Sequence, residues 1–159
     1  IIHEEVDSFQ SNAENLSKVA SDDLFKNIKS FSLIIGAIDP FQNITETYGA
    51  ETADRLLISL AADFPKFLRS RDVIARWQND EFLFLLPEIT LNNAKAVAER
   101  IRKNIEEQTY PYNNSILSVT MTFGVSTIHI NETANDLLKR VNNTLYKGKN
   151  MGGNCVVTA

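Results

Sequence analysis

The sequence predicts a single α/β domain in which helices pack on a mixed β-sheet. Apolar residues recur at helical spacing in some segments, and in others they alternate with polar residues or run without interruption. These segments follow one another as helix, strand, helix, helix, strand, strand, helix, strand, helix and strand. With 159 residues, 43% of them hydrophobic and 23% charged, the chain is the size of one domain and can bury a substantial core.

The first part of the chain predicts a helical segment followed by a buried strand. Residues 8–29 carry apolar side chains close to helical spacing, which indicates one or two helices within an N-terminal segment, 1–30. Residues 31–38 form a continuous apolar run rich in branched side chains, as in a central strand covered on both faces, and Asp39-Pro40 ends it. Two helices are expected next, at 41–48, ended by a left-handed Gly49, and at 52–64.

The remainder predicts a hairpin, two more helices and two more strands. Thr133 and Asp136 have the spacing of a helix cap, and Gly152-Gly153 should end the helix that they begin. The expected elements are hairpin strands at 72–77 and 81–86, a helix at 91–107, a strand at 118–126, the helix after Thr133, and a last strand at 155–157.

The charge of the chain argues against a surface that coats nucleic acid. The net charge is −4 and the pI is near 5.2, whereas such surfaces need clustered excess lysine and arginine. Five of the seven arginines nevertheless lie in two short stretches. They are Arg69, Arg71, Arg76, Arg100 and Arg102. We expect them to form a local cationic site for a small anion.

Other features indicate a cytoplasmic domain. Cys155 is the single cysteine, which rules out an internal disulfide, and His3 and His129 lack the spacing of a zinc site. No apolar run approaches the roughly 18 residues needed to cross a bilayer, and no signal-peptide pattern occurs, so we expect no membrane contact by this segment. The chain begins with Ile1 rather than Met, which suggests a piece of a longer protein.

Residues 69–82 are the most informative stretch, since they predict a strand, a tight turn and a second strand with opposed charges. The stretch resembles the signature of the GGDEF, or diguanylate cyclase, family. In that family an Arg-x-x-Asp motif precedes Gly-Gly-Asp/Glu-Glu-Phe by nine residues. Here Arg69 and Asp72 keep this spacing, and Gln78-Asn79 replaces Gly-Gly before Asp80-Glu81-Phe82. The resemblance runs from about 31 to 157, with further markers at 119–124 and 145–154.

The resemblance implies a fold and a domain arrangement. It implies a central, mostly antiparallel sheet with flanking helices, similar to nucleotide cyclases and polymerase palm domains. Residues 31–159 would be the GGDEF domain, and residues 1–30 would lead from an upstream domain. Fused sensor or output domains and a homodimer are the expected partners, with no nucleic acid.

The resemblance also implies that the catalytic site is vestigial. In the family, an Asp near the end of the first strand and the third residue of the turn hold magnesium on the GTP phosphates, which neutralises developing charge. Ala37 occupies the first position and Asp80, followed by Glu81, the second. Asp39 lies on the same strand face and could substitute weakly. The side chains of Gln78 and Asn79 are expected where the nucleotide would lie.

The nucleotide-binding positions are also incomplete. The guanine-reading Asn of the family is Thr45, whereas the guanine-reading Asp is kept as Asp54. The remaining phosphate-binding positions are Gln42 in place of Lys, and Lys149 with Gly153 in place of a Lys and Arg pair. We therefore predict no cyclase activity, no metal site and no required cofactor.

The product-binding site of the family is present by residue type. It corresponds to Arg69, Asp72 and Arg100, which could grip the phosphates and guanine edges of cyclic di-GMP, as a stacked ligand dimer bridging two domains. The plainer interpretation is a surface salt bridge between Arg69 and Asp72 and a solvated Arg100.

The predicted function is therefore an inactive GGDEF domain that acts as a cyclic di-GMP receptor. One alternative is a dimerisation or interaction scaffold that binds no nucleotide. A third is a GTP-binding allosteric domain, or a weak cyclase, which would use Asp54, Asp80, Glu81 and Lys149. Trp77 is expected to serve packing.

Overall fold

The computed structural model describes residues 30–78, 80–112 and 115–159. The helices expected within 8–29 lie outside these ranges, and the domain division at residue 30 stays a prediction. No helix in the described ranges is both long and apolar enough to cross a membrane.

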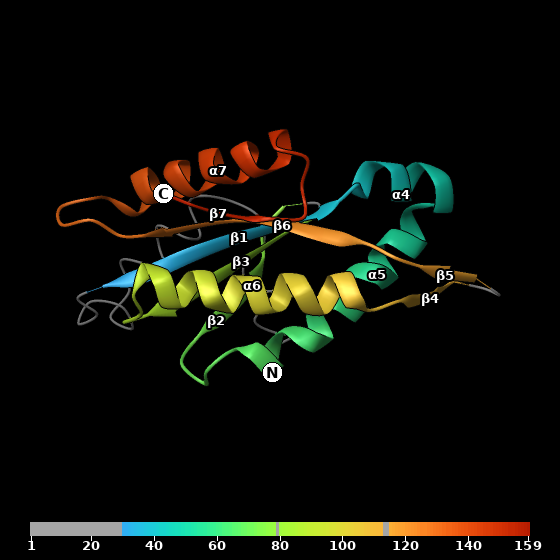
Figure 1. Cartoon of the computed structure of the whole chain (residues 1–159), viewed down its shortest axis with the longest axis horizontal. Coiled ribbons are helices and arrows are strands. Elements are labelled where there is room, and N and C mark those ends of the chain that lie inside the picture. Colours follow the sequence, from blue (N-terminus) through green and yellow to red (C-terminus); the bar gives the residue numbers. More distant parts are fainter. Residues whose placement is uncertain (1–29, 79, 113–114) are drawn as a thin grey trace.

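The centre of the domain is a five-stranded sheet with the strand order β2-β3-β1-β6-β7 (Figure 1). Its strands are β1 (Phe31–Asp39), β2 (Val73–Arg76), β3 (Glu81–Pro87), β6 (Thr120–Thr127) and β7 (Val156–Thr158). β1 pairs antiparallel with β3 on one side and with β6 on the other. β2 pairs antiparallel with β3, and only the pairing of β6 with β7 is parallel. The expectation of a mostly antiparallel sheet with flanking helices is confirmed.

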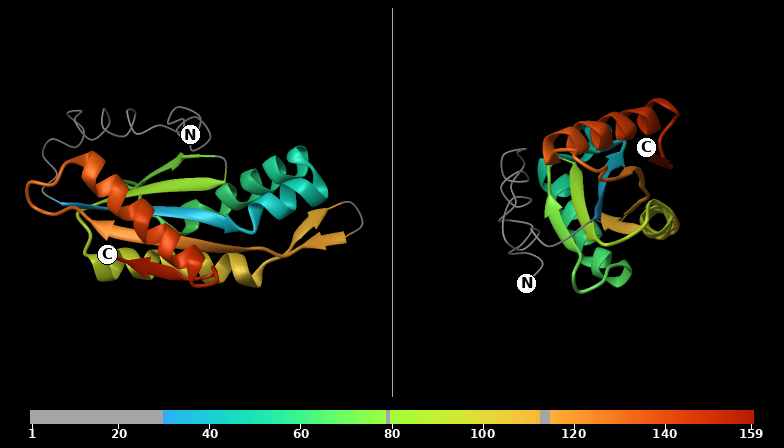
Figure 2. Two further views of the ribbon diagram at one scale, coloured as in Figure 1. Left: turned by 90° about the horizontal axis from the view of Figure 1, so that it is seen from above. Right: turned by 90° about the vertical axis from the view of Figure 1, so that its left-hand side faces the viewer.

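Helices cover both faces of this sheet (Figure 2). The described helices are α4 (Phe41–Tyr48), which lies beyond the end of β1, α5 (Ala50–Asp63), the short 3₁₀ helix η1 (Phe64–Phe67), α6 (Leu91–Glu107) and α7 (Ala134–Asn150). α5 and α6 bury their apolar stripes against one face, and α7 buries its stripe against the other. This division follows from the alternation of β1, since Ile34 and Ile38 face α5 and α6 while Leu33 and Ile35 face α7.

The sequence-based boundaries agree closely with the observed ones. α4 and α6 have the predicted ends, while α5 begins two residues earlier than expected and Phe64 continues into η1. The cap at Thr133 is confirmed, because its hydroxyl accepts a hydrogen bond of 3.1 Å from the main-chain N–H of Asp136. Gly49 has a φ of 92° and a ψ of 161°. It therefore separates α4 from α5 with an extended, positive-φ backbone rather than the predicted left-handed helical one.

A second, two-stranded sheet was not predicted. It consists of β4 (Tyr110–Tyr112) and β5 (Ser115–Leu117) and projects beyond α5 in Figure 1. Each strand has three residues and one contains Pro111, so neither shows the alternation over four or more residues by which strands are recognised.

Close packing of α7 on β6 fixes the position of the middle of this helix. A Cβ atom on Gly124 would lie 2.7 Å from both the carbonyl oxygen of Val141 and the main-chain nitrogen of Leu145. Only glycine lets the helix backbone approach the strand this closely. Trp77 is buried in the same core layer, which confirms its predicted packing role.

Candidate ligand-binding sites

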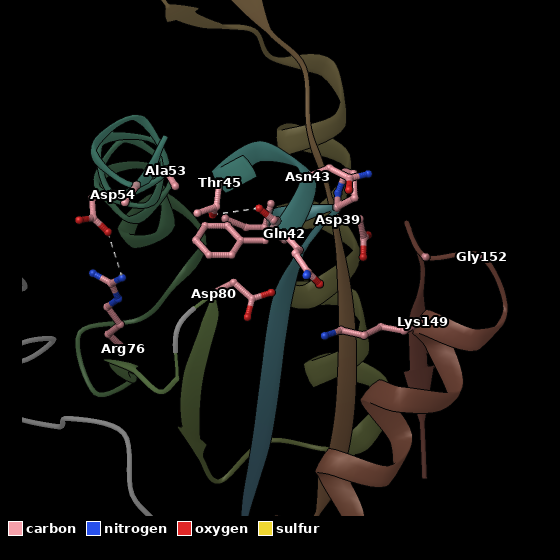
Figure 3. A pocket seen from close by; sticks show the side chains of 15 residues that line it. Asp39, Gln42, Asn43, Thr45, Ala53, Asp54, Arg76, Asp80, Lys149 and Gly152 are labelled. Carbon is pink, nitrogen blue, oxygen red and sulfur yellow. Dashed lines mark hydrogen bonds and ion pairs between the residues drawn. The ribbon is translucent and has the colours of Figure 1, made fainter. Parts of the chain in front are cut away.

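The carboxylate pocket is a cavity of about 910 Å³ at the end of β1 (Figure 3). The first turn of α4, the residue before β3 and the last turn of α7 surround it. The side chains that matter for its chemistry are those of Asp39, Thr45, Asp54, Arg76, Asp80 and Lys149. The predicted nucleotide-site residues that line this cavity are Asp39, Gln42, Thr45, Asp54, Asp80, Lys149 and Gly153. Glu81 does not line it but follows Asp80 directly.

The sheet register places Ala37 between two polar residues beside the pocket. Ala37 is paired with Glu81 on β3 and with Thr122 on β6. Directly paired residues point to the same face of a sheet, here the face covered by α7. Ala37 is fully buried and brings no polar atom to this position.

Asp39 is engaged in structural hydrogen bonds. Its Oδ2 atom accepts from the hydroxyls of Thr122 at 2.7 Å and Thr120 at 3.2 Å, and from the main-chain N–H of Asn154 at 3.0 Å. Asp39 therefore connects β1 to β6 and to the turn after α7. Because its Oδ2 atom already accepts these hydrogen bonds, Asp39 is poorly suited to its predicted role as a substitute magnesium ligand.

Asp80 and Glu81 are carboxyl groups in a partly desolvated environment. Burial raises the pKa of each above its ordinary value, and the positive charge of Lys149 opposes this shift in both pKa values. Glu81 is only 8% exposed. In Figure 3 the side chain of Lys149 extends from α7 towards Asp80. Lys149 is thus the counter-charge that the protein provides for this acidic pair.

The residues present do not fit the magnesium ion that the family resemblance implies. Magnesium requires oxygen ligands in near-octahedral geometry. Ala37 has no such oxygen, and Oδ2 of Asp39 already accepts three hydrogen bonds. Asp80 is half-buried and faces Lys149, while the exposed carboxylate of Asp54 lies beside Arg76. Within the described ranges, no group of three or more His, Cys, Asp or Glu side chains is arranged to hold a metal ion.

The side chains at the two predicted guanine-reading positions, Asp54 and Thr45, also have interaction partners within the protein. The Asp54 carboxylate lies 3.7 Å from the Arg76 guanidinium, and the Thr45 hydroxyl donates to the carbonyl of Phe41 at 3.2 Å. Gln78 is exposed and is not among the residues lining the pocket, so the predicted obstruction by this side chain is not observed. Asn79 lies outside the described residues.

The arginine pocket is a second cavity, of about 540 Å³, at the other end of β3. It is formed by the loop after η1, the β3–α6 connection and one side of α6. Arg69, Asp72 and Arg100 all line it, as the resemblance predicted. Sequence reasoning missed three further polar lining residues, Glu88, Thr90 and Asn93. The Thr-x-x-Asn spacing was the available signal for two of them, since the Thr90 hydroxyl caps α6 by accepting from the N–H of Asn93.

Arg69 and Asp72 bind each other closely. Nη2 of Arg69 lies 2.8 Å from Oδ1 of Asp72, and the main-chain N–H of Arg69 donates to Oδ2 at 2.7 Å. Nη2 also donates to the carbonyl of Pro87 at 2.6 Å. The Asp72 side chain is 2% exposed and that of Arg69 is 41% exposed. In this conformation Asp72 orients Arg69 and is itself covered by the structure.

The clustered arginines do not form one cationic site, contrary to the expectation from their spacing. Arg76 lines the carboxylate pocket. Arg71 pairs with Glu88 at 3.1 Å. Arg102 pairs with two glutamates of its own helix and donates to the side chain of Asn154 at 2.9 Å. The fold separates these arginines because they lie on different strands, loops and helix faces.

Comparisons with known proteins agree on one family. The family model described as "Diguanylate cyclase, GGDEF domain" matches residues 9–155. Diguanylate cyclase A of Treponema denticola is 35% identical over 129 residues, which cover 80% of this chain and 35% of that protein. Diguanylate cyclase DgcM of Escherichia coli K12 is 33% identical over 131 residues, covering 82% of this chain and 31% of the relative. The chain thus spans about a third of the length of these relatives.

Solved structures show the same fold. The crystal structure of the diguanylate cyclase SiaD of Pseudomonas aeruginosa, in complex with its activator SiaC, matches with a TM-score of 0.80 and 26% identity over 99% of this chain and 58% of that one. The active GGEEF domain of a Vibrio cholerae diguanylate cyclase matches with a TM-score of 0.74 and 27% identity, covering 81% of this chain and 82% of the other.

Proposed function

Because the chain belongs to the GGDEF family of diguanylate cyclases, we propose that it is a regulatory domain that binds cyclic di-GMP in the arginine pocket and does not synthesise it. The observation that carries this proposal is the meeting of Arg69, Asp72 and Arg100 in one cavity. The domain would act in the cytoplasm, attached to sensor or output domains, whose state the ligand would change.

The chemistry of the arginine pocket suits a guanine dinucleotide. A guanidinium group can donate two parallel hydrogen bonds to a phosphate or to the O6 and N7 atoms of guanine. Asp72 and the Pro87 carbonyl hold one edge of the Arg69 guanidinium, which fixes its direction before a ligand arrives. Arg100 is exposed on α6 and supplies the second guanidinium of the same cavity. Pre-oriented donors lose less conformational entropy on binding than mobile ones.

The carboxylate pocket supports the second half of the proposal, the absence of synthesis. Phosphoryl transfer depends on cations that neutralise the charge developing on the phosphates. Ala37 brings no ligand for such a cation, and Asp39 is committed to β6 and Asn154. Loss of one well-placed electrostatic contact commonly costs on the order of 10² to 10³ in rate. We therefore expect no cyclic di-GMP when the domain is incubated with GTP and magnesium.

Titration calorimetry with cyclic di-GMP tests the binding half of the proposal. We expect micromolar or tighter binding to the wild-type domain and a loss of at least about tenfold in affinity for Arg69→Ala and for Arg100→Ala. Arg100→Ala is included because Arg69→Ala also leaves the covered Asp72 carboxylate without its partner. Arg55→Ala is the matched control, since Arg55 forms an exposed ion pair with Glu51 on α5 and lies outside the arginine pocket.

Three results would contradict the proposal. Absence of heat at high ligand concentration would favour the interaction scaffold, which binds no nucleotide. Equal affinities of wild type and Arg100→Ala would place the ligand elsewhere. Formation of cyclic di-GMP from GTP would show that the domain is a cyclase.

A further inference from the structure

Two carboxylates among the described residues line the arginine pocket, and they differ in how accessible they are to a ligand. They belong to Asp72 and Glu88. The Asp72 side chain is 2% exposed, and both of its oxygens accept hydrogen bonds from Arg69. The Glu88 side chain, in contrast, is 52% exposed. A ligand that enters this pocket would therefore meet the carboxylate of Glu88 before that of Asp72.

Glu88 is held in place through both its main chain and its side chain. Its N–H donates to the carbonyl of Ser30 at 2.8 Å, and its Oε2 lies 3.1 Å from Nη2 of Arg71. Its φ is 49°, in the left-handed region that residues other than glycine seldom adopt. The fold therefore fixes the direction in which the chain turns away from β3 at this residue.

Glu88 also lies next to the group that orients Arg69. The preceding residue is Pro87, whose carbonyl accepts from Nη2 of Arg69 at 2.6 Å. A guanidinium donor and a carboxylate acceptor thus occupy the same wall of the pocket. Guanine presents the complementary pattern, since its acceptors O6 and N7 lie beside the donors N1–H and N2–H₂.

Arg71 makes the negative charge of Glu88 compatible with an anionic ligand. Arg71 does not line the pocket, but its ion pair with Glu88 offsets the charge that would otherwise repel phosphates. A carboxylate has about four acceptor positions, and the contact with Arg71 occupies only part of them. Glu88 can therefore accept hydrogen bonds from a base while Arg69 and Arg100 remain available to the rest of the ligand.

We propose that Glu88 determines the base specificity of the arginine pocket by accepting hydrogen bonds from N1–H and N2–H₂ of guanine. This inference rests on the proposed function, the binding of cyclic di-GMP in this pocket. Arg69 and Arg100 hold O6, N7 and the phosphates, and Asp72 is a positioning residue that orients Arg69. Adenine has an acceptor at N1 and no amino group at C2, so it cannot make the pair of bonds to Glu88.

Titration calorimetry with cyclic di-GMP and with its inosine analogue, cyclic di-IMP, tests this inference. The analogue lacks only the N2 amino groups, so it keeps every contact assigned to Arg69 and Arg100. We expect the wild type to bind cyclic di-GMP about tenfold more tightly than cyclic di-IMP. In Glu88→Ala this ratio should fall to about one, chiefly because cyclic di-GMP binds more weakly.

Two further variants separate base recognition from other effects. Asp72→Asn should weaken the binding of both ligands by the same factor and leave their ratio unchanged, since Asp72 acts through Arg69. Glu51→Ala is the matched control, because Glu51 also forms an exposed ion pair with an arginine and lies outside the pocket. Both affinities of Glu51→Ala should equal those of the wild type.

The outcomes distinguish a failure of this inference from a failure of the proposed function. If the wild type binds cyclic di-GMP but the ratio is unchanged in Glu88→Ala, the inference alone is wrong. A ratio that falls in Asp72→Asn and not in Glu88→Ala would assign base recognition to Asp72. Absence of cyclic di-GMP binding by the wild type would overturn the proposed function and this inference with it.

Discussion

The arginine pocket and the carboxylate pocket differ in how their acidic groups are compensated. In the arginine pocket, Asp72 receives hydrogen bonds of 2.7 and 2.8 Å from Arg69. In the carboxylate pocket, burial raises the pKa values of Asp80 and Glu81, and Lys149 offsets this only in part. The first pocket is therefore stable without a ligand, whereas the second would gain from a bound group that changes its charge balance. The difference in function that we propose for the two pockets corresponds to this difference in charge compensation.

The two pockets are nevertheless built on shared elements. β3 begins at Glu81, beside the carboxylate pocket, and ends at Pro87, whose carbonyl accepts from Arg69 in the arginine pocket. α6 carries Arg100 into the arginine pocket, and two residues later Arg102 donates to Asn154. The main-chain N–H of Asn154 in turn donates to Asp39. Variants that act on one pocket alone are needed to separate their contributions.

The largest effect is expected from Gly124→Ala, which should damage the carboxylate pocket and spare the arginine pocket. The added methyl group would lie 2.7 Å from backbone atoms of α7, so the helix that carries Lys149 must move away from β6. Overpacking of this kind costs about 1–3 kcal/mol and occasionally more, and we expect the upper end because backbone cannot yield as a side chain can. Urea unfolding should show this loss of stability.

Ser126→Ala is the control for Gly124→Ala. Ser126 is also buried on β6, and its hydroxyl lacks a hydrogen-bond partner among the described residues. Its removal should be neutral or slightly stabilising. Cyclic di-GMP binding should persist in Gly124→Ala, because neither β6 nor α7 lines the arginine pocket. Unchanged stability in Gly124→Ala would show that α7 is not held as closely as the structure indicates.

The sequence was sufficient to predict most of the helices and strands but not the interactions of their side chains. Hydrophobic periodicity predicted α6 and α7 because each of these helices has 17 residues over which the apolar spacing repeats. It did not predict β4 and β5, because a strand of three residues is too short to show alternation. The spacing of the motif predicted that Arg69, Asp72 and Arg100 lie close together, and all three line one cavity. It could not show that Asp72 is covered by Arg69, because exposure depends on the path of the loop and not on residue type.

The same limit applies at the carboxylate pocket. The sequence predicts Asp39 only as a weak substitute for the magnesium ligand missing at Ala37, because the two residues lie on the same strand face. The hydrogen bonds of Asp39 come from Thr120, Thr122 and Asn154, which are at least 81 residues away along the chain. Contacts at such separations are set by sheet register, which the local pattern does not specify.

A smaller loss of stability than for Gly124→Ala is expected from Asp72→Asn. The substitution removes the charge that Arg69 faces and turns an amide donor towards guanidinium donors. We expect a loss of about 1–2 kcal/mol in unfolding free energy at pH 7 and weaker binding of cyclic di-GMP. Asp63→Asn is the control, because Asp63 forms an ion pair of the same i,i+3 spacing with the exposed Lys66 and should change stability by less than about 1 kcal/mol. Equal losses in the two variants would mean that the Arg69–Asp72 pair is an ordinary surface ion pair.

The smallest effect is expected from Glu81→Gln. This substitution should raise the stability at pH 7, whereas Gly124→Ala and Asp72→Asn should lower it. Burial raises the pKa of Glu81 above its ordinary value near 4.5, so the folded protein holds this proton more tightly than the unfolded chain. The unfolding free energy of the wild type therefore falls as the pH rises from that ordinary value through the raised pKa. Glu81→Gln removes this dependence. It should be more stable than the wild type at pH 7, by on the order of 1 kcal/mol or less, and equal to it near pH 4.

Glu132→Gln calibrates the pH measurement of Glu81→Gln, because hydrogen bonds from Arg140 lower the pKa of Glu132. Its contribution to stability is present above the ordinary pKa and is lost as the pH falls through the lowered one. Glu132→Gln should therefore be less stable than the wild type at pH 7, the opposite of Glu81→Gln. Thermal unfolding of the three proteins between pH 4 and pH 8 measures both signs. If Glu81→Gln were also destabilised at pH 7, the carboxylate of Glu81 would be well compensated, and the contrast between the two pockets would fail.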